Sequence, residues 1–374
     1  MHSADNMVCV SSDATCHEES NMPQLRKNPV TREWVIIATE RSRRPSDFSQ
    51  AEDTSSSSKP AFSDNCPFCP GHEEMTPPEV LAFRGVPNAP NTPGWWVRVV
   101  PNKFPALAIE GDLGRSGVGM YDFMNGVGAH EVIIETPEHN KCMATMAPRQ
   151  AEEVWWACAQ RMMDLGNDQR FEYVSVFRNH GKVAGTSLEH PHSQLVALPM
   201  IPMEVRTEIM GADTYYSYHE RCIFCDMIRQ ERNFGERVVV ETDEFLAFEP
   251  FAPKFPFETW IISKTHSKSF TDDAEQMIPG FTKVLQEALR RIGECLNYPP
   301  YNYTLHTAPF LTDKTHVFHW HLEIMPRLTI AAGFEMGTGI YINVTAPEDA
   351  AAHLRAVGKE STAAKPAKAV KVHG

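Results

Sequence analysis

Short apolar, β-branched runs punctuated by proline and glycine recur along this chain, which predicts many short β-strands. Two stretches are instead predicted to be helices. One covers residues 148–165, with Pro148 in its first turn and a glycine just beyond its end. The other follows Pro279, and its apolar residues form one stripe: Phe281, Val284, Leu285, Leu289, Ile292 and Leu296. The pattern therefore predicts a protein of mixed helix and strand.

The predicted elements occur in the same order twice. In the first half, strands are predicted at residues 96–100, 131–135, 173–177 and 194–198, with the helix between the second and third. In the second half they are predicted at residues 238–240, 245–248, 259–262, 303–305 and 322–324, again around one helix. This repetition predicts an α+β fold of two antiparallel-sheet halves, each with a packed helix, and the halves could share one continuous sheet.

The repeat also gives the expected domain organisation. We expect an N-terminal domain at residues 23–205 and a C-terminal domain at residues 206–356, divided where Pro202 and a polar stretch interrupt the pattern. Residues 1–22 and 357–374 contain few large apolar side chains, so we expect them to be disordered.

Composition limits the partners and the compartment. The net charge of −13 argues against a broad binding surface for nucleic acid or an anionic membrane. No apolar run approaches the roughly 20 residues that span a bilayer, and nothing at the N-terminus resembles a signal peptide. We therefore expect a cytoplasmic protein. Its nine cysteines then favour metal binding or free thiols over disulfides.

Each half carries a Cys-x-x-Cys pair, then a lone histidine, then a His-x-His motif, at nearly equal spacing. Zinc binds two thiolates and two imidazoles tetrahedrally, which leaves no open position and makes such a site structural. A single Cys-x-x-Cys could be a redox pair, but two copies with matched histidines favour zinc. The second ion could be iron, although two thiolates again favour zinc. The expected ligand sets are Cys66, Cys69, His139 and His190 in the first half, and Cys222, Cys225, His266 and His319 in the second.

The second histidine of each His-x-His motif remains for chemistry. Pro191 makes a regular strand unfavourable there, so His190 can face the metal while His192 faces a substrate. A neutral imidazole is a competent nucleophile, and Ser187 and Gln194 offer donors to phosphate oxygens. The alternative is that both histidines are metal ligands or core residues. Only the first copy keeps Pro, Ser and Gln around the motif, so His192 is the expected nucleophile.

With His-Pro-His-x-Gln at residues 190–194, the chain resembles the galactose-1-phosphate uridylyltransferase family, a branch of the histidine-triad superfamily, from about residue 25 to residue 356. Further matches lie at residues 28–34, 41–45, 102–105 and 177–181. The resemblance implies a duplicated histidine-triad-like fold and a ping-pong reaction. The histidine matching His192 attacks the α-phosphorus of a sugar nucleotide and releases a hexose 1-phosphate, and a second phosphate acceptor then takes the nucleotidyl group.

The resemblance also implies roles for further residues and a homodimer in which the partner chain completes the sugar end of the site. The positions that match the family's zinc ligands are Cys66, Cys69, His139 and His190. The positions that match substrate contacts are Asn102 and Phe104 for the nucleoside, Asn179, Ser187 and Gln194 for phosphate, Arg41 and Arg44 as basic residues near the phosphates, and Glu335 for the sugar.

The second half departs from the familiar enzymes. Their second metal site, built from a glutamate and histidines, is replaced by Cys-x-x-Cys and His266, as in the ADP-glucose phosphorylase branch. Near Glu335, Tyr341 stands where a glutamine is expected, and the preceding lysine is missing. Our leading hypothesis is a UDP-glucose–hexose-1-phosphate uridylyltransferase of galactose metabolism. The alternative is an ADP-glucose phosphorylase, which converts ADP-glucose and phosphate to ADP and glucose 1-phosphate. A third hypothesis is a zinc-stapled nucleotide-binding module without turnover.

Overall fold

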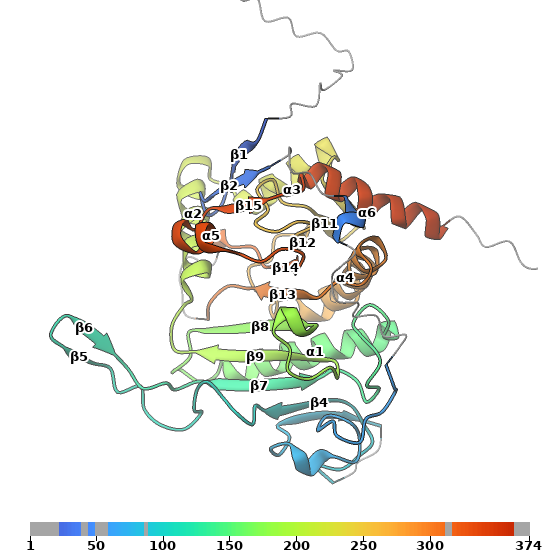
Figure 1. The fold of residues 1–374 in the computed structure, drawn as a ribbon. Helices are drawn as coiled ribbons and strands as arrows, with labels where there is room; N and C mark the ends of the chain where they lie inside the picture. The colour runs from blue at the N-terminus through green and yellow to red at the C-terminus, as the bar shows by residue number, and fades with distance from the viewer. Residues whose placement is uncertain (1–21, 39–43, 49–58, 86–88, 311–315, 363–374) are drawn as a thin grey trace, which may run out of the picture.

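The computed structural model describes residues 22–38, 44–48, 59–85, 89–310 and 316–362 (Figure 1). Arg41 and nearly all of the N-terminal segment 1–22 lie outside these residues. No helix in the described part of the chain is both long and apolar enough to cross a membrane.

One ten-stranded sheet runs through the molecule in the order β10-β11-β12-β14-β13-β8-β9-β7-β4-β3. Its strands are β3 (Leu81–Arg84), β4 (Trp95–Pro101), β7 (Ala129–Ile134), β8 (Tyr173–His180), β9 (His192–Leu198), β10 (Val238–Glu241), β11 (Phe245–Phe248), β12 (Thr259–Ser263), β13 (Tyr301–His306) and β14 (His321–Pro326). Every pair in it is antiparallel. The two halves meet where β8 pairs with β13, as Figure 1 shows. The α+β prediction with one shared sheet is confirmed.

Each half has one long helix on the same face of the sheet. Helix α1 (Pro148–Leu165) packs on β4, β7 and β8, α4 (Ala274–Leu296) packs on β10, β11 and β12, and the two helices contact each other. The predicted stripe of α4 is buried, with no residue above 4% exposure. The expected start of this helix was wrong, because Pro279 lies inside it. The stripe continues upstream through buried Ile278 and Ala274, and this burial outweighs the one hydrogen bond that the proline removes.

One further helix occupies the stretch that we expected to be the domain boundary, and another follows it. They are α2 (Met203–His219) and α3 (Ile223–Phe234). Val205, Ile209 and Ala212 recur at helical spacing on α2 and are buried in a core that includes Leu246 and Phe248, away from the core under α4. The second half is therefore covered on both faces of the sheet. The predicted division after residue 205 falls in the first turn of α2.

Segments near the two ends of the chain, one from each predicted domain, pair with each other. Strands β1 (Gln24–Lys27), β2 (Trp34–Ile37) and β15 (Tyr341–Asn343) form a separate sheet in the order β1-β2-β15. Helices α5 (Gly333–Thr338) and α6 (Pro347–Thr362) flank β15 in the sequence. Residues 357–362, which we expected to be disordered, continue α6. The Arg355 guanidinium fixes this helix by donating to the carbonyl oxygens of Glu236 and Val238. Because adding a residue to an existing helix is easier than starting one, the helix can continue through residues 357–362.

A two-stranded hairpin, β5 (Ser116–Val118) and β6 (Tyr121–Phe123), projects from the body of the molecule on the left of Figure 1. Its apolar side chains are exposed, 65% for Val118, 85% for Met120 and 71% for Tyr121. Three short 3-10 turns complete the described elements: η2 (Pro45–Phe48), η4 (Glu73–Met75) and η5 (Lys182–Ala184).

Candidate active site

The structure brings the first predicted ligand set together. Cys66 and Cys69 lie in one tight turn, where the Cys69 N–H donates to the Cys66 carbonyl; His139 follows β7, and His190 precedes β9. All four side chains are buried, and their ligand atoms lie within 4.8 Å of one another. Cys69 Sγ is 3.5 Å from His139 Nδ1 and 3.6 Å from His190 Nδ1. Ideal tetrahedral zinc bonds place sulfur and nitrogen about 3.6 Å apart, so the four residues fit this ion.

The surroundings of this cluster favour metal-binding protonation states. His190 Nε2–H donates to the carbonyl oxygen of Thr136 at 2.7 Å, so the lone pair of Nδ1 faces the cysteines. Burial lowers the pKa of His190 to about 3 and also lowers the pKa of His139, so both rings are neutral. Burial raises the pKa of the Cys66 thiol to about 11. A thiolate there needs a nearby cation, which a divalent metal would supply.

The second ligand set repeats this geometry. The ligand atoms of Cys222, Cys225, His266 and His319 also lie within 4.8 Å of one another. Cys225 Sγ is 3.5 Å from His266 Nδ1 and 3.6 Å from His319 Nδ1. Ser263 Oγ gives its own proton to the Thr265 carbonyl, so it accepts from His319 Nε2–H at 2.9 Å. His190 and His319 therefore have the same tautomer, with the proton on Nε2 and the lone pair of Nδ1 toward the cysteines.

The two remaining histidines differ in access. His192 Nδ1–H donates to the His190 carbonyl at 2.8 Å, and His321 Nδ1–H donates to the His319 carbonyl at 3.0 Å. Each ring therefore keeps its lone pair on Nε2. His321 is fully buried, stacks on Trp260 with centroids 4.8 Å apart, and its Nε2 has no hydrogen-bond partner. His192 is 7% exposed and lines two pockets, so it alone of the pair can meet a substrate. Pro191 does not disturb the strand, since regular pairing starts at His192, opposite Ile134.

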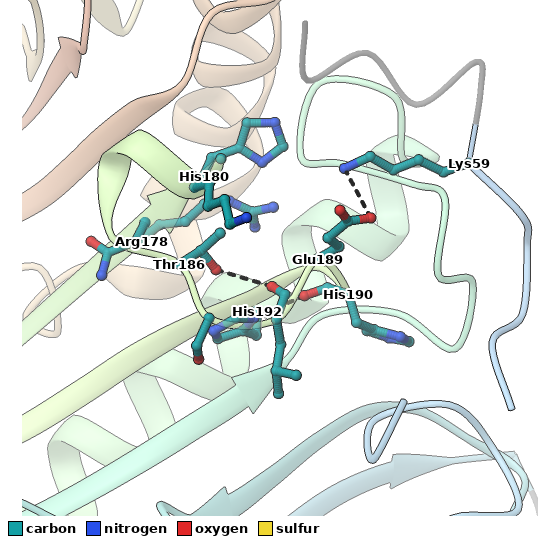
Figure 2. A pocket seen from close by; sticks show the side chains of 12 residues that line it. Lys59, Arg178, His180, Thr186, Glu189, His190 and His192 are labelled. Atoms are coloured by element: carbon teal, nitrogen blue, oxygen red, sulfur yellow. Dashed lines mark hydrogen bonds and ion pairs between the residues drawn. The ribbon is translucent and has the colours of Figure 1, made fainter. Parts of the chain in front are cut away.

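The two pockets next to His192 have different chemistry. The first, of about 310 Å³, has basic residues on its walls: Lys59, Arg178, His180 and Lys182. Figure 2 shows this pocket, with Lys59 and Glu189 facing each other in a 3.8 Å ion pair. The second, of about 380 Å³, has mainly aromatic and aliphatic walls, including Phe68, Val100, Phe104 and Val132. A nucleotide-sized molecule could therefore place an anionic group in the basic pocket and an apolar ring in the other.

Five of the predicted substrate contacts line these pockets, and two described ones do not. Asn179 lines the basic pocket, Ser187 lines both, and three residues line the apolar pocket: Asn102, Phe104 and Gln194. Arg44 is exposed and lines neither pocket. Glu335 also lines neither; its Oε2 accepts from the Ala332 N–H at the start of α5.

A buried ion pair behind His192 was missed from the sequence. Arg178 on β8 is 2% exposed and pairs with Glu135, which is fully buried. Glu135 also accepts from Ser193 Oγ at 2.6 Å, and this hydroxyl lies 3.0 Å from Tyr303 Oη. Burial, followed by the positive charge of Arg178, lowers the pKa of His192. The motif at residues 177–181 contained Arg178, but only the fold shows that its charge is buried and paired with Glu135 at the edge of the basic pocket.

A third cluster was also missed. Glu208, His306, His321 and Glu323 place their ligand atoms within 4.8 Å of one another, and Glu208 Oε1 lies 3.0 Å from His306 Nδ1. Burial opposes a charge on His306, but the two carboxylates outweigh it and raise the pKa of His306 to about 10. These residues could hold a metal ion. The expected replacement of a glutamate–histidine set by the cysteine set is therefore wrong, because both sets are present. Glu208 lies on α2, a helix that the sequence pattern did not reveal.

Comparison with known proteins identifies family models and relatives that match this chain. The family model "Galactose-1-phosphate uridyl transferase, N-terminal domain" matches residues 13–202, and a model of a domain of unknown function matches residues 127–368. An ADP-glucose phosphorylase of Arabidopsis thaliana is 36% identical over 346 residues, covering 91% of this chain and 94% of the relative. A galactose-1-phosphate uridylyltransferase of Thermotoga maritima is 29% identical over 344 residues, covering 89% and 98%.

Solved structures agree with these relatives. The crystal structure of an Arabidopsis thaliana ADP-glucose phosphorylase with bound ADP-glucose has a TM-score of 0.74 and 33% identity, covering 89% of this chain and 99% of that one. A uridylyltransferase structure has a TM-score of 0.69 and 27% identity, covering 91% and 100%. The match therefore spans both halves of the ten-stranded sheet. This chain belongs to the galactose-1-phosphate uridylyltransferase family.

Proposed function

We propose that the protein is a nucleotidyltransferase that works in two steps through a covalent nucleotidyl group on His192. One observation carries this proposal. The His190 carbonyl holds the proton of His192 on Nδ1, which leaves the lone pair of Nε2 on a ring that borders both pockets. A neutral imidazole held in this tautomer is prepared for attack without a separate base.

In the first step, His192 Nε2 attacks the α-phosphorus of a sugar nucleotide. A phosphorus–nitrogen bond forms, and the bond from the α-phosphorus to the bridging oxygen breaks, releasing a hexose 1-phosphate. In the second step, a phosphate oxygen of the acceptor attacks the same phosphorus, and the electron pair returns to Nε2. The nucleoside fits the apolar pocket with Phe104, and the leaving and accepting phosphates fit the basic pocket with Lys182.

The surrounding charges support this chemistry. Burial and Arg178 lower the pKa of His192, so the ring is neutral at neutral pH and available as a nucleophile. Ser187 and Gln194 supply donors near the position of the transferred group. Such fixed donors stabilise the charge that builds on phosphate oxygens in the transition state.

Two substrate pairs are compatible with this site. The first is UDP-glucose with a hexose 1-phosphate such as galactose 1-phosphate, the uridylyltransferase reaction for which several relatives are named. The second is ADP-glucose with inorganic phosphate. Two observations favour it: the phosphorylase relative has 36% identity against 29% for the Thermotoga uridylyltransferase, and the second cluster contains Cys222 and Cys225, the feature that first suggested this branch.

We also propose that both Cys₂His₂ clusters hold zinc. Their sulfur–nitrogen distances support a tetrahedral ion, and four protein ligands leave no position for substrate, so the metal would tie the cysteine turns to the sheet. In the first half this fixes His190, whose carbonyl in turn orients His192. A homodimer is our proposal for the assembly, because Glu335 lies outside both pockets of its own chain and the apolar hairpin offers a contact surface. Cytoplasmic location, and the lack of nucleic-acid or membrane partners, stay predictions.

Covalent labelling tests the proposal. The protein is incubated with UDP-glucose or ADP-glucose labelled at the α-phosphate and then quenched. We expect label that is stable in base and lost in acid, as for a phosphoramidate, and the nucleotide that labels faster identifies the donor. His192→Gly should accumulate no label, whereas His180→Gly, which alters another histidine of the basic pocket, should still label. If His192→Gly labels like the unaltered protein, the proposal is wrong; nucleotide binding without label in the unaltered protein would instead indicate a binding module.

A further inference from the structure

His130 contacts one predicted phosphate contact, Gln194, and one predicted nucleoside contact, Asn102. It is on β7, where Val132 pairs with Gln194 of β9. His130 and Val132 point to the same face of the sheet, so His130 is the diagonal neighbour of Gln194. Its ring nitrogen Nε2 lies 2.8 Å from Gln194 Oε1. The two strands therefore bring a partly buried imidazole into contact with a residue that lines the apolar pocket.

The surroundings of His130 select its tautomer. The backbone N–H of Ala106 donates to His130 Nδ1 at 3.3 Å, so Nδ1 carries the lone pair. In the neutral ring the proton is then on Nε2, and it is donated to Gln194 Oε1. Because this bond engages the amide oxygen of Gln194, the amide nitrogen is the end left for a ligand. Gln194 then presents a donor, which suits phosphate oxygens.

His130 also holds the turn that carries the nucleoside contacts. Its backbone oxygen accepts from the Asn102 N–H at 2.8 Å, and Asn102 Oδ1 accepts from the Phe104 N–H at 2.9 Å. The Asn102 amide nitrogen also lies 3.1 Å from His130 Nε2. Because the proton of Nε2 is donated to Gln194, this contact is not a hydrogen bond. His130 thus holds Asn102 through its backbone oxygen and Gln194 through its ring.

We propose that His130 is a positioning residue for nucleotidyl transfer, which orients the Gln194 amide with its nitrogen toward the phosphate of the nucleotide. The inference rests on the proposed function. It concerns a step that His192 alone does not control, because the orientation of a free glutamine amide is not fixed by its own side chain. Without His130, Gln194 can turn its oxygen toward the phosphate, where it repels the phosphate oxygens.

The test compares three single variants and one double variant by rate of covalent labelling and by nucleoside monophosphate affinity, measured by calorimetry. His130→Phe keeps a ring but has no donor, and we expect it to label about tenfold more slowly, the order of one lost hydrogen bond. His130→Gln can place an amide donor near the position of Nε2, and it should stay within about threefold of the unaltered protein. Gln194→Ala should be impaired, and adding His130→Phe to it should cause no further loss.

The outcomes are separable. Full activity of His130→Phe, or an undiminished tenfold loss when it is added to Gln194→Ala, would refute the positioning role. An equal loss in His130→Gln and His130→Phe would also refute it, since that pattern reflects damage to the fold, which thermal unfolding of both variants would reveal. If the unaltered protein binds nucleotide but never labels, the proposed function fails. The affinity measurements then test His130 on their own: an affinity loss that disappears in the Gln194→Ala background supports it, and an unchanged affinity overturns it.

Discussion

Replacing Arg178 with methionine removes one member of the buried ion pair behind His192. Arg178 is 2% exposed and Glu135 is fully buried, so solvent cannot compensate for the lost charge. After the change, Glu135 keeps only the hydrogen bond from Ser193 Oγ among the side-chain bonds described for it. Leaving one charge of such a pair without its partner costs about 3–5 kcal/mol of unfolding free energy. The remaining bond from Ser193 favours the lower end of this range.

The same change should alter the pH dependence of labelling. Burial and then Arg178 lower the pKa of His192, while Glu135 raises it. Removing Arg178 takes away one of the two influences that lower this pKa, while the raising influence of Glu135 stays, so the pKa of His192 rises. The ring then becomes protonated at a higher pH, and the acid limb of the labelling rate moves toward neutrality.

Urea unfolding and the pH profile of covalent labelling measure the two effects. The control is the double variant Arg178→Met with Glu135→Leu, which removes both charges and should regain most of the lost stability. Destabilisation below about 1 kcal/mol, or a double variant no more stable than the single one, would refute the buried-pair argument. An acid limb that stays in place would refute the electrostatic argument independently.

Three further predictions concern the metal clusters, the nucleophile and the core. Cys66→Ala and treatment with a strong chelator should each lower the thermal unfolding temperature, and metal analysis of the freshly purified protein should find zinc; its absence would contradict structural zinc. In the unaltered protein, labelling should fall only below about pH 6.5, the unperturbed value for histidine, because burial lowers the pKa of His192; a midpoint above this pH would contradict the direction of the shift. Leu285→Ala on α4, at a position with no exposure, should cost about 2–5 kcal/mol in urea unfolding while leaving the pH profile unchanged, and a loss under 1 kcal/mol would mean that the stripe is not packed as described.

The sequence by itself determined the repeated architecture and the candidate residues for the chemistry. Helix 148–165 was predicted with both ends correct, because Pro148 and the following glycine are local signals, and the stripe of α4 was found because helical periodicity is also local. Motif spacing grouped the two Cys₂His₂ sets before any contact was known, and the structure places the members of each set together. These features can be predicted from the sequence because each depends on local signals or on the spacing of motifs along the chain.

Only the tertiary structure decided which histidine is accessible and what surrounds it. His192 and His321 share a motif and a tautomer, yet Trp260 covers one of them while two pockets open beside the other. The third cluster and the contact between His130 and Gln194 likewise join segments brought together by α2 and by strand pairing. Burial and charge act through space, so residues far apart in sequence set the reactivity of a ring that its own motif leaves undetermined.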